Sequence, residues 1–276
     1  ASIRRTVSYP HLEILILNND SEEDETKDYL EEINQQEDIK VLNIEGKFNF
    51  SRLNNIGAQK ASGELLLMLN NDTEAIQKNW LEEMIVHAVR NDIGCVGARL
   101  LNPDNTIQHG GVVFGHYGGG IHAFRNLPMK DARYNGHLQL DRNYSAITAA
   151  CLMVKKKIFL NIGGLNETNF AVSYNDTDFC LRIQNSGLYN LFTAQANLYH
   201  LESVSRGSDL LPQNMERATK ERNCQHLIWF SIVECDPQYN VNLSRHFEDF
   251  SHFRFIKNLP HQNSSIVLKK SFKNTV

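Results

Sequence analysis

The chain has 276 residues, of which 41% are hydrophobic and 22% charged, and its formal net charge is −4. This length can hold one large domain or two small ones with a substantial buried core. The weak negative charge argues against nucleic acid as a partner, because binding a polyanion needs a basic face. No apolar run reaches the roughly 20 residues of a membrane-spanning helix.

The five cysteines are scattered, odd in number and without CxxC spacing. This pattern argues against both a disulfide framework and a zinc site. A reducing, cytoplasmic setting is therefore the expected location.

Residues 1–102 alternate between strand and helix patterns. Apolar runs predict strands over residues 11–17, 39–44, 64–69 and 93–100. Between them, polar and amphipathic stretches predict helices over residues 22–35, 51–61 and 76–90. Strands that alternate with helices imply an α/β fold with a mostly parallel, Rossmann-like sheet flanked by helices.

The pattern changes after residue 102. Residues 103–143 hold three consecutive glycines and many aromatic and histidine residues, which is typical of a long irregular excursion that carries binding loops. The later patterns predict helices over 176–185 and 214–230 and strands over 146–155, 188–193 and 196–200. The polar tail, residues 256–276, is expected to be solvated, and contact of its lysines with a membrane surface is the alternative.

Polar side chains follow three of the predicted strands. Asn18 ends the first strand, Asn70, Asn71 and Asp72 follow the third, and His200 ends the last. Ligands of α/β sheets bind at the carboxyl ends of strands. Oxygen ligands together with an imidazole suit Mn²⁺ or Mg²⁺, whose remaining positions water and phosphate oxygens can fill. Each segment alone has a structural alternative, because Asn and Asp form turns and single histidines are often structural.

Two carboxylates lie at the start of the predicted helix over 176–185. Asp176 and Asp178 are two residues apart, so they do not share a helix face and are expected to point in different directions. The N-terminus of a helix favours the charged form of a carboxylate, which suits a general base. The alternative for Asp176 is an ordinary helix cap.

These segments, in this order, resemble the inverting family 2 glycosyltransferases of the GT-A fold, and among them the rhamnosyltransferase-like members that build O-antigen and capsular polysaccharide. The stretches that carry the resemblance are FNFSRLNNIGAQKASGELLLMLNNDTE, PDNTIQHGGVVFG, ITAACLMVKK, GGLNETNFAVSYNDTDFCLR, LYHLESVSRG and DPQYNVNLS. The resemblance runs from about residue 8 to about residue 250. It implies a GT-A fold and a glycosyltransferase of the hexosyltransferase type.

The resemblance also implies roles for individual residues. Asp72 stands at the second acid of the family's DxD motif and His200 at its metal-binding histidine, so both would be metal ligands. Asp176 matches the catalytic base that deprotonates the acceptor hydroxyl. The positions that match the donor site, from the base pocket to the loop over the diphosphate, are Asn18, Asn55, Gly57, Asn70, Asn71, Ser203, Ser205 and Arg206.

The mechanism that the resemblance implies is a single in-line displacement with inversion. Asp176 would take the acceptor proton, while Mn²⁺ or Mg²⁺, with Arg206, offsets the charge on the leaving diphosphate. The expected donor is dTDP-rhamnose or a UDP-sugar, and the expected acceptor is a glycan or lipid-linked glycan of a bacterial polysaccharide. The expected location is the cytoplasm, with peripheral contact at the inner face of the plasma membrane as the alternative.

The chain departs from the family pattern in two ways. Asn replaces an acid at Asn18, Asn70 and Asn175. The family's usual first strand is also absent, because residues 1–17 resemble the following helix and the second strand. The chain is then a fragment of a longer protein, or the strand comes from elsewhere. A sheet without this strand would expose a central edge and favour self-association.

The expected organisation is one GT-A domain over residues 1–255, with a nucleotide-binding half over 1–102, an acceptor-binding half over 103–255 and the tail. The alternative function is a catalytically silent nucleotide-sugar or glycan binding domain of a larger glycan synthase. A dinucleotide-binding oxidoreductase shares the alternating pattern but is disfavoured, because no GxGxxG turn follows the early strand.

Overall fold

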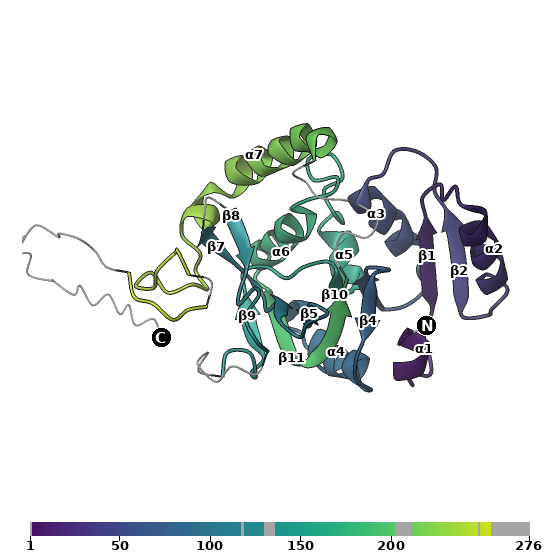
Figure 1. The fold of residues 1–276 in the computed structure, drawn as a ribbon, viewed down its shortest axis with the longest axis horizontal. Coiled ribbons are helices and arrows are strands. Elements are labelled where there is room, and N and C mark those ends of the chain that lie inside the picture. The colour runs from purple at the N-terminus through teal and green to yellow at the C-terminus, as the bar shows by residue number, and fades with distance from the viewer. Residues whose placement is uncertain (1, 117–118, 130–135, 202–210, 248, 255–276) are drawn as a thin grey trace, which may run out of the picture.

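The computed structural model describes residues 2–116, 119–129, 136–201, 211–247 and 249–254 (Figure 1). The helices are α1 (Ser2–Thr6), α2 (Asp24–Ile33), α3 (Phe50–Lys60), α4 (Trp80–Ala88), α5 (Lys156–Asn161), α6 (Asn175–Asn185) and α7 (Pro212–Glu234). The strands are β1 (Ile14–Asn18), β2 (Ile39–Asn43), β3 (Leu65–Leu69), β4 (Thr73–Ala75), β5 (Ile93–Leu101), β6 (Ile107–His109), β7 (Val112–His116), β8 (Gly119–His122), β9 (Arg142–Tyr144), β10 (Cys151–Lys155) and β11 (Tyr189–His200). The tail expected over 256–276 lies outside the described residues.

The main sheet has seven strands in the order β3-β10-β5-β11-β4, with β6 added to β5 and β9 to β11. The predicted α/β class is confirmed. Among the described strands, however, parallel pairing is confined to β1–β2 and β5–β11, so the expectation of a mostly parallel sheet needs correction. The reason is that β10 follows an excursion of short strands instead of the crossover helix that a parallel neighbour requires.

β1 and β2 form a separate two-stranded parallel sheet, which Figure 1 shows beside the larger sheet with α2 and α3 around it. Among the described residues, β1 and β3 each pair with a strand on one edge only. The apolar residues of β1 are all half-buried. Each of these strands therefore has one edge without a described partner strand.

The helices and strands expected over residues 1–102 are all present, with ends shifted by a few residues. Local chemistry explains their limits. Asn49 caps α3, since its side chain accepts a hydrogen bond from Arg52 N at 2.9 Å. The structure adds β4, whose three residues are too few to show a strand period in the sequence.

The excursion over residues 103–143 is more regular than expected. It contains β6, the hairpin β7–β8 and β9, so the expectation of irregular structure is wrong for these segments. They are three to five residues long, which is too short for alternation to be told from a loop. Gly111, with φ of +102°, lets the chain approach Tyr144 closely, because a Cβ would lie 2.5 Å from that ring.

Two later predictions also need adjustment. The strand expected over 146–155 begins only at Cys151, because residues 147–150 leave the ladder in a turn. The two strands expected over 188–193 and 196–200 are one strand, β11, with an irregular register between Thr193 and Asn197. Both changes matter for the site, which is built on this turn and on the end of β11.

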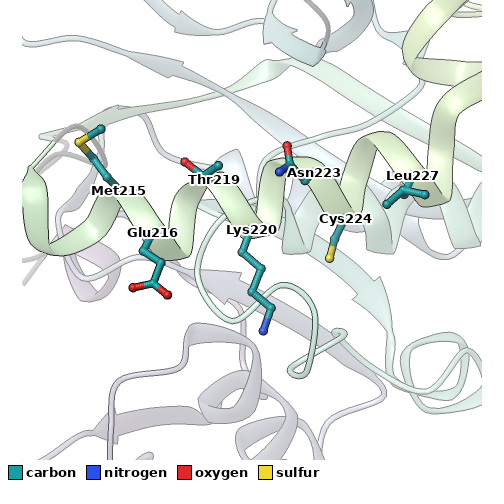
Figure 2. Close-up of a pocket in the computed structure, with 7 residues that line it drawn as sticks. All are labelled: Met215, Glu216, Thr219, Lys220, Asn223, Cys224 and Leu227. Carbon is teal, nitrogen blue, oxygen red and sulfur yellow. The ribbon is translucent and has the colours of Figure 1, made fainter.

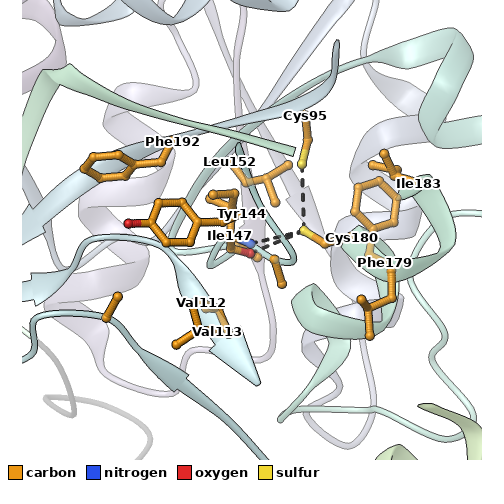
Figure 3. Packing of buried hydrophobic residues seen from close by; sticks show 14 of the residues in the cluster. Cys95, Val112, Val113, Tyr144, Ile147, Leu152, Phe179, Cys180, Ile183 and Phe192 are labelled. Carbon is orange, nitrogen blue, oxygen red and sulfur yellow. Dashed lines mark hydrogen bonds between the residues drawn. The ribbon is translucent and has the colours of Figure 1, made fainter. Parts of the chain in front are cut away.

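Two hydrophobic clusters cover the two faces of the main sheet. On one face, Trp80 and Met84 of α4 pack over β5, β10 and β11. On the other, side chains of α5, α6 and β7 pack together, including Phe179 (Figure 3). β5 is buried along its whole length, and consecutive residues such as Cys95 and Val96 belong to opposite clusters. The sheet therefore forms a fixed platform for the side chains at its edges.

α7 is the longest described helix and contacts the β7–β8 hairpin (Figure 1). It bends at Trp229, whose φ and ψ of −114° and 25° are not helical. In the part of the chain that the structure describes, no helix has the length and apolar character needed to cross a membrane.

Candidate active site

The pairing of β4 with β11 brings Asp72 and His200 together. Thr73 is the partner of His200 in this antiparallel ladder, and Leu201 N donates to Asp72 O at 2.9 Å. As a result, Asp72 Oδ1 lies 3.1 Å from His200 Nε2. The two side chains are only 16% and 10% exposed, so this carboxylate and imidazole form a largely buried polar pair.

Asn70 completes this corner of the site. Its backbone N donates to Ala150 O at 3.0 Å, and its carbonyl accepts a hydrogen bond from Thr73 Oγ1 at 2.7 Å. These bonds fix the turn between β3 and β4. The side chain of Asn70 then lies with Nδ2 3.3 Å from His200 Nε2. The run of small polar residues that ends the apolar strand therefore forms a tight turn whose side chains meet the end of β11.

The charge of Asp72 is set by its neighbour. A hydrogen-bonding contact with His200 lowers the pKa of Asp72 below its ordinary value, although burial acts in the opposite direction. Asp72 is consequently a carboxylate at neutral pH. Its Oδ1 is buried, and beyond this contact with His200 it has no hydrogen-bond partner among the described residues. A buried oxygen of this kind is normally paired, so it points to a group that the described residues do not supply.

The Asp72–His200 pair fits a divalent cation. Adjacent ligands on an octahedral ion with bonds of about 2.1 Å are about 3.0 Å apart, which is close to the 3.1 Å between Asp72 Oδ1 and His200 Nε2. Among the described residues, no group of three His, Cys, Asp or Glu side chains could hold a metal. A metal here would therefore need oxygens from the substrate and water, as Mg²⁺ commonly does at phosphate sites.

Asp176 is held differently, in the first turn of α6. Its Oδ2 accepts a hydrogen bond from Ala149 N at 3.1 Å, and its Oδ1 accepts one from Thr177 N at 2.8 Å. Asp178, two residues on, points elsewhere, as the spacing predicts: it accepts bonds from Arg182 Nε at 2.9 Å and Trp229 Nε1 at 3.0 Å. Of these two carboxylates, Asp176 is the more accessible, because Asp178 is buried.

The turn that precedes β10 contacts both Asp176 and the turn at Asn70. Ala149 N donates to Asp176, and the next residue, Ala150, accepts from Asn70 N. Asp176 and the Asn70 turn therefore lie against neighbouring residues of the segment that precedes β10. The structure thus brings together four of the residues expected from the sequence, namely Asn70, Asp72, Asp176 and His200.

Side chains on one face of α7 form hydrogen bonds with the start of α6. The sequence patterns did not predict these contacts. Glu221, Gln225 and Trp229 recur every four residues and are buried. Glu221 accepts from Ser173 N at 2.7 Å, and Gln225 Nε2 donates to Thr177 Oγ1 at 2.8 Å. Together with the bond from Trp229 to Asp178, these contacts lie on both sides of Asp176. The four-residue spacing was visible in the sequence, but nothing in it identified the partner segment.

Gln108 and His109 of β6 also lie beside the expected site residues, and the sequence did not indicate a role for either. Gln108 Oε1 lies 2.6 Å from His200 Nδ1, and Gln108 Nε2 donates to His200 O at 3.1 Å. His109 is fully buried, and this burial, followed by the nearby His122 and His200, lowers its pKa well below the ordinary value. His109 is therefore neutral, and its Nε2 lies 3.5 Å from Thr148 N, just before the turn that joins the two corners.

The residues expected at the donor lie in several places. Asn18 ends β1, and its side chain bonds to Asn43 Oδ1 at 2.8 Å and to Ser21 Oγ at 2.6 Å. Asn71 is exposed in the turn between β3 and β4. The three expected residues Ser203, Ser205 and Arg206 lie outside the described residues.

Asn55 and Gly57 of α3 have structural contacts that account for these residue types. Asn55 Nδ2 donates to Leu165 O at 2.9 Å and its Oδ1 accepts from Leu165 N at 2.8 Å, which fixes the loop after α5. Gly57 allows α3 to lie against β1, because a Cβ there would be 3.0 Å from the Leu17 side chain. Asn55 also lines a cavity with Phe159 and Arg182.

A second, open groove runs along α7 (Figure 2). It is lined by Met215, Glu216, Thr219, Lys220, Asn223, Cys224 and Leu227. None of the residues expected at the site lies in it. The residues expected at the site therefore lie at the strand ends and at the start of α6, and not in this groove.

Comparison with known proteins places these features in context. Residues 1–163 match the family model for glycosyl transferase family 2. The chain is 39% identical over 250 residues to the uncharacterized protein y4gI of Sinorhizobium fredii (strain NBRC 101917 / NGR234), an alignment that covers 90% of this chain and 28% of that protein. It is also 39% identical over 213 residues to the O-antigen biosynthesis protein RfbC of Myxococcus xanthus, covering 77% of this chain and 16% of RfbC. The chain thus spans less than a third of the length of these relatives.

Solved structures show the fold. The chain resembles GalNAc-T7 with UDP, GalNAc and Mn²⁺, with a TM-score of 0.58, 17% identity, and 79% of this chain and 44% of that chain covered. It also resembles the mannosyltransferase PcManGT of Pyrobaculum calidifontis in complex with GDP-Man and Mn²⁺, with a TM-score of 0.54, 15% identity, and 82% and 56% covered. The GT-A fold expected from the sequence is confirmed by these likenesses.

Proposed function

Because this chain belongs to glycosyl transferase family 2, we propose that it transfers a sugar from a nucleotide-sugar donor to a polysaccharide acceptor, with divalent metal and with inversion. The observation that supports this proposal best is that Asp72 and Asp176, which have different surroundings, both lie close to the turn that precedes β10. Asp72 faces His200 with a buried oxygen that has no other partner among the described residues, while Asp176 is held by backbone N–H groups. Inverting transfer with a metal needs both a site for the cation that binds the diphosphate and a general base.

Asp176 is the proposed general base. The bonds from Ala149 N and Thr177 N orient its carboxylate. Each oxygen keeps a second lone pair, so the carboxylate can accept the proton of an acceptor hydroxyl as that oxygen attacks the anomeric carbon. General-base assistance of this kind typically contributes about 10²- to 10⁴-fold to the rate.

Asp72 and His200 are the proposed protein ligands of Mn²⁺ or Mg²⁺. When bound, the metal would supply Lewis-acid stabilisation of the charge that develops on the leaving diphosphate. Asp72 provides the negative charge, and His200 provides an imidazole nitrogen at the end of β11. The side-chain amide of Asn70 lies 3.3 Å from His200 Nε2 and would give this nitrogen a polar partner while no metal is bound. Asn18, Asn71, Ser203, Ser205 and Arg206 remain the proposed contacts to the nucleotide and its diphosphate.

We further propose a bacterial polysaccharide as the product, with dTDP-rhamnose or a UDP-sugar as donor and a glycan or lipid-linked glycan as acceptor. The similarity to RfbC, an O-antigen biosynthesis protein, supports this product class. The nucleotides and Mn²⁺ named with the two solved structures support the donor class. The five free cysteines support a reducing, cytoplasmic location.

Calorimetric titration with UDP, dTDP and GDP, each with and without Mn²⁺, tests the donor site. We expect one nucleotide to bind in a metal-dependent way, and Asp72→Ala to remove this dependence. Asp24→Asn is a suitable control, because Asp24 is an exposed acid in the first turn of α2. Failure of all three nucleotides to bind with Mn²⁺ would contradict the proposed donor site.

The alternative is a silent nucleotide-sugar or glycan binding domain of a larger synthase. Its support is that the chain spans only 28% and 16% of two relatives and that β1–β2 is separate from the main sheet. Slow hydrolysis of the nucleotide sugar, in which water replaces the acceptor, distinguishes the two functions. Hydrolysis that is lost in Asp176→Asn supports the enzyme, whereas nucleotide-sugar binding without any hydrolysis supports the silent domain.

A further inference from the structure

We propose that Gln108 is a positioning residue that keeps the proton of His200 on Nδ1 and thereby directs the lone pair of Nε2 toward Asp72. This inference rests on the proposed function, because it concerns how the chain prepares His200 to bind a divalent cation. The family resemblance and the comparisons assign no role to Gln108.

The orientation of the Gln108 amide is fixed by the backbone of His200. The amide lies between His200 O, at 3.1 Å from Nε2 of Gln108, and His200 Nδ1, at 2.6 Å from Oε1 of Gln108. A backbone carbonyl can only accept a hydrogen bond, so the NH₂ group must face it. The oxygen of the amide then faces Nδ1, which must donate.

The proton on Nδ1 determines the state of Nε2. A neutral imidazole carries one proton, so a proton on Nδ1 leaves a lone pair on Nε2. The neighbours of Nε2 are the Asn70 amide at 3.3 Å and Asp72 Oδ1 at 3.1 Å. In the neutral ring, Asn70 can donate to this lone pair, and the lone pair also faces Asp72 Oδ1. A cation placed between Nε2 and Oδ1 could therefore take both atoms as ligands.

The position of Gln108 is itself well determined. It is 3% exposed and lies in β6, between residues that pair with β5. Its backbone carbonyl also contacts His122 Nδ1 at 3.1 Å. A buried side chain in a short, paired strand has little freedom to turn away, so the contact to His200 is built into the sheet. Partners that bond the other nitrogen of a metal-binding histidine set its tautomer and ring orientation in this way.

An amide also suits this position better than a carboxylate. Glutamate could accept from His200 Nδ1, but it could not donate to His200 O. The variants Gln108→Glu and Gln108→Leu therefore separate the two functions of the amide, because only the first keeps an acceptor at Nδ1. Gln139→Leu, at an exposed residue, is the matched control.

The test is the tautomer of His200 by ¹H–¹⁵N NMR in the metal-free protein, with the signal assigned through His200→Ala. We expect the proton on Nδ1 in the wild-type chain, in Gln139→Leu and in Gln108→Glu, and a shift of protons to Nε2 in Gln108→Leu. A wild-type His200 with its proton on Nε2 would overturn the proposal, and this measurement requires no variant to fold.

The second measurement is the affinity for Mn²⁺ alone, from the electron paramagnetic resonance signal of the free ion. We expect Gln108→Leu to weaken Mn²⁺ binding by about 10- to 100-fold, with the fold checked by circular dichroism. Unchanged tautomer and Mn²⁺ affinity in a folded Gln108→Leu would overturn the inference. A wild-type chain that keeps the Nδ1 proton but binds no Mn²⁺ would support the role of Gln108 in holding His200 while overturning the proposed metal site.

Discussion

Asp72 and Asp176 lie at the same end of the sheet but are held in opposite ways. Both oxygens of Asp176 accept hydrogen bonds from backbone N–H groups, and α7 supports the residues on either side of it. Asp72 has a buried Oδ1 without a hydrogen-bond partner among the described residues, and it faces a histidine nitrogen instead. Among the described residues, both oxygens of Asp176 thus have backbone donors, whereas Oδ1 of Asp72 has only its contact with His200.

This difference teaches which part of the site depends on a ligand. A carboxylate whose bonds come from the backbone keeps its place whether or not substrate is present. Beyond its contact with His200, Asp72 Oδ1 has no hydrogen-bond partner among the described residues, so a bound cation would add a favourable contact that these residues do not provide. We therefore expect substitutions of Asp176 to affect the reaction, and substitutions of Asp72 to affect metal and nucleotide binding.

The largest effect is expected for Asp176→Asn. Turnover should fall by about 10²- to 10⁴-fold, because the amide cannot take the acceptor proton. Metal-dependent nucleotide binding should stay close to that of the wild-type chain and of Asp24→Asn. Turnover and calorimetric binding, measured on the same samples, check this separation. An equal loss in both would remove Asp176 from the role of base.

The next effect is the stabilisation of the fold by ligand. Mn²⁺ and the bound nucleotide at about 100 times the dissociation constant should raise the free energy of unfolding by about 2.7 kcal/mol. Thermal unfolding with and without a chelator measures this gain. It should persist in Asp176→Asn and vanish in Asp72→Ala. A gain of the same size in Asp72→Ala would show that Asp72 is not a metal ligand.

A smaller effect is expected for Trp229→Phe, which tests the support of Asp176 by α7. The change removes the donor to Asp178 Oδ1 and leaves a buried carboxylate oxygen unpaired. The free energy of unfolding should fall by about 1–3 kcal/mol. Turnover should also decline, because the first turn of α6 loses an anchor. Urea unfolding checks the first result. Phe230→Leu, at the next and exposed residue, is the control and should change little.

The smallest effect is expected for Asp72→Asn in the absence of metal. The variant loses the carboxylate contact with His200 but also removes a buried charge, and its amide can donate to Nε2. The free energy of unfolding should therefore change by no more than about 1 kcal/mol. A loss as large as that of Trp229→Phe would mean that Asp72 contributes to the fold, and the contrast between the two carboxylates would then be wrong.

Much of the site could be predicted because its residues lie where the sequence pattern is strongest. The apolar run of β3 ends at Asn70, and a strand that ends in polar residues at one edge of a sheet predicts a site there. The spacing of Asp176 and Asp178 also predicted that they diverge. The supporting residues were not predictable in this way. Asn55, expected at the donor, is bonded to Leu165, which lies far away in the sequence.

The sequence by itself determined the α/β alternation, the positions of most helices and strands, the family resemblance and the side chains able to carry the chemistry. These properties follow from local periodicity and from the residue types at strand ends. Only the tertiary structure decided which other side chains form hydrogen bonds with the candidate site residues and with the segments that carry them. Gln108 meets His200, and α7 meets the start of α6, because the order and register of strands and the packing of helices fix these pairs. Such contacts join distant segments through single hydrogen bonds, and a single hydrogen bond has no period that a sequence can display.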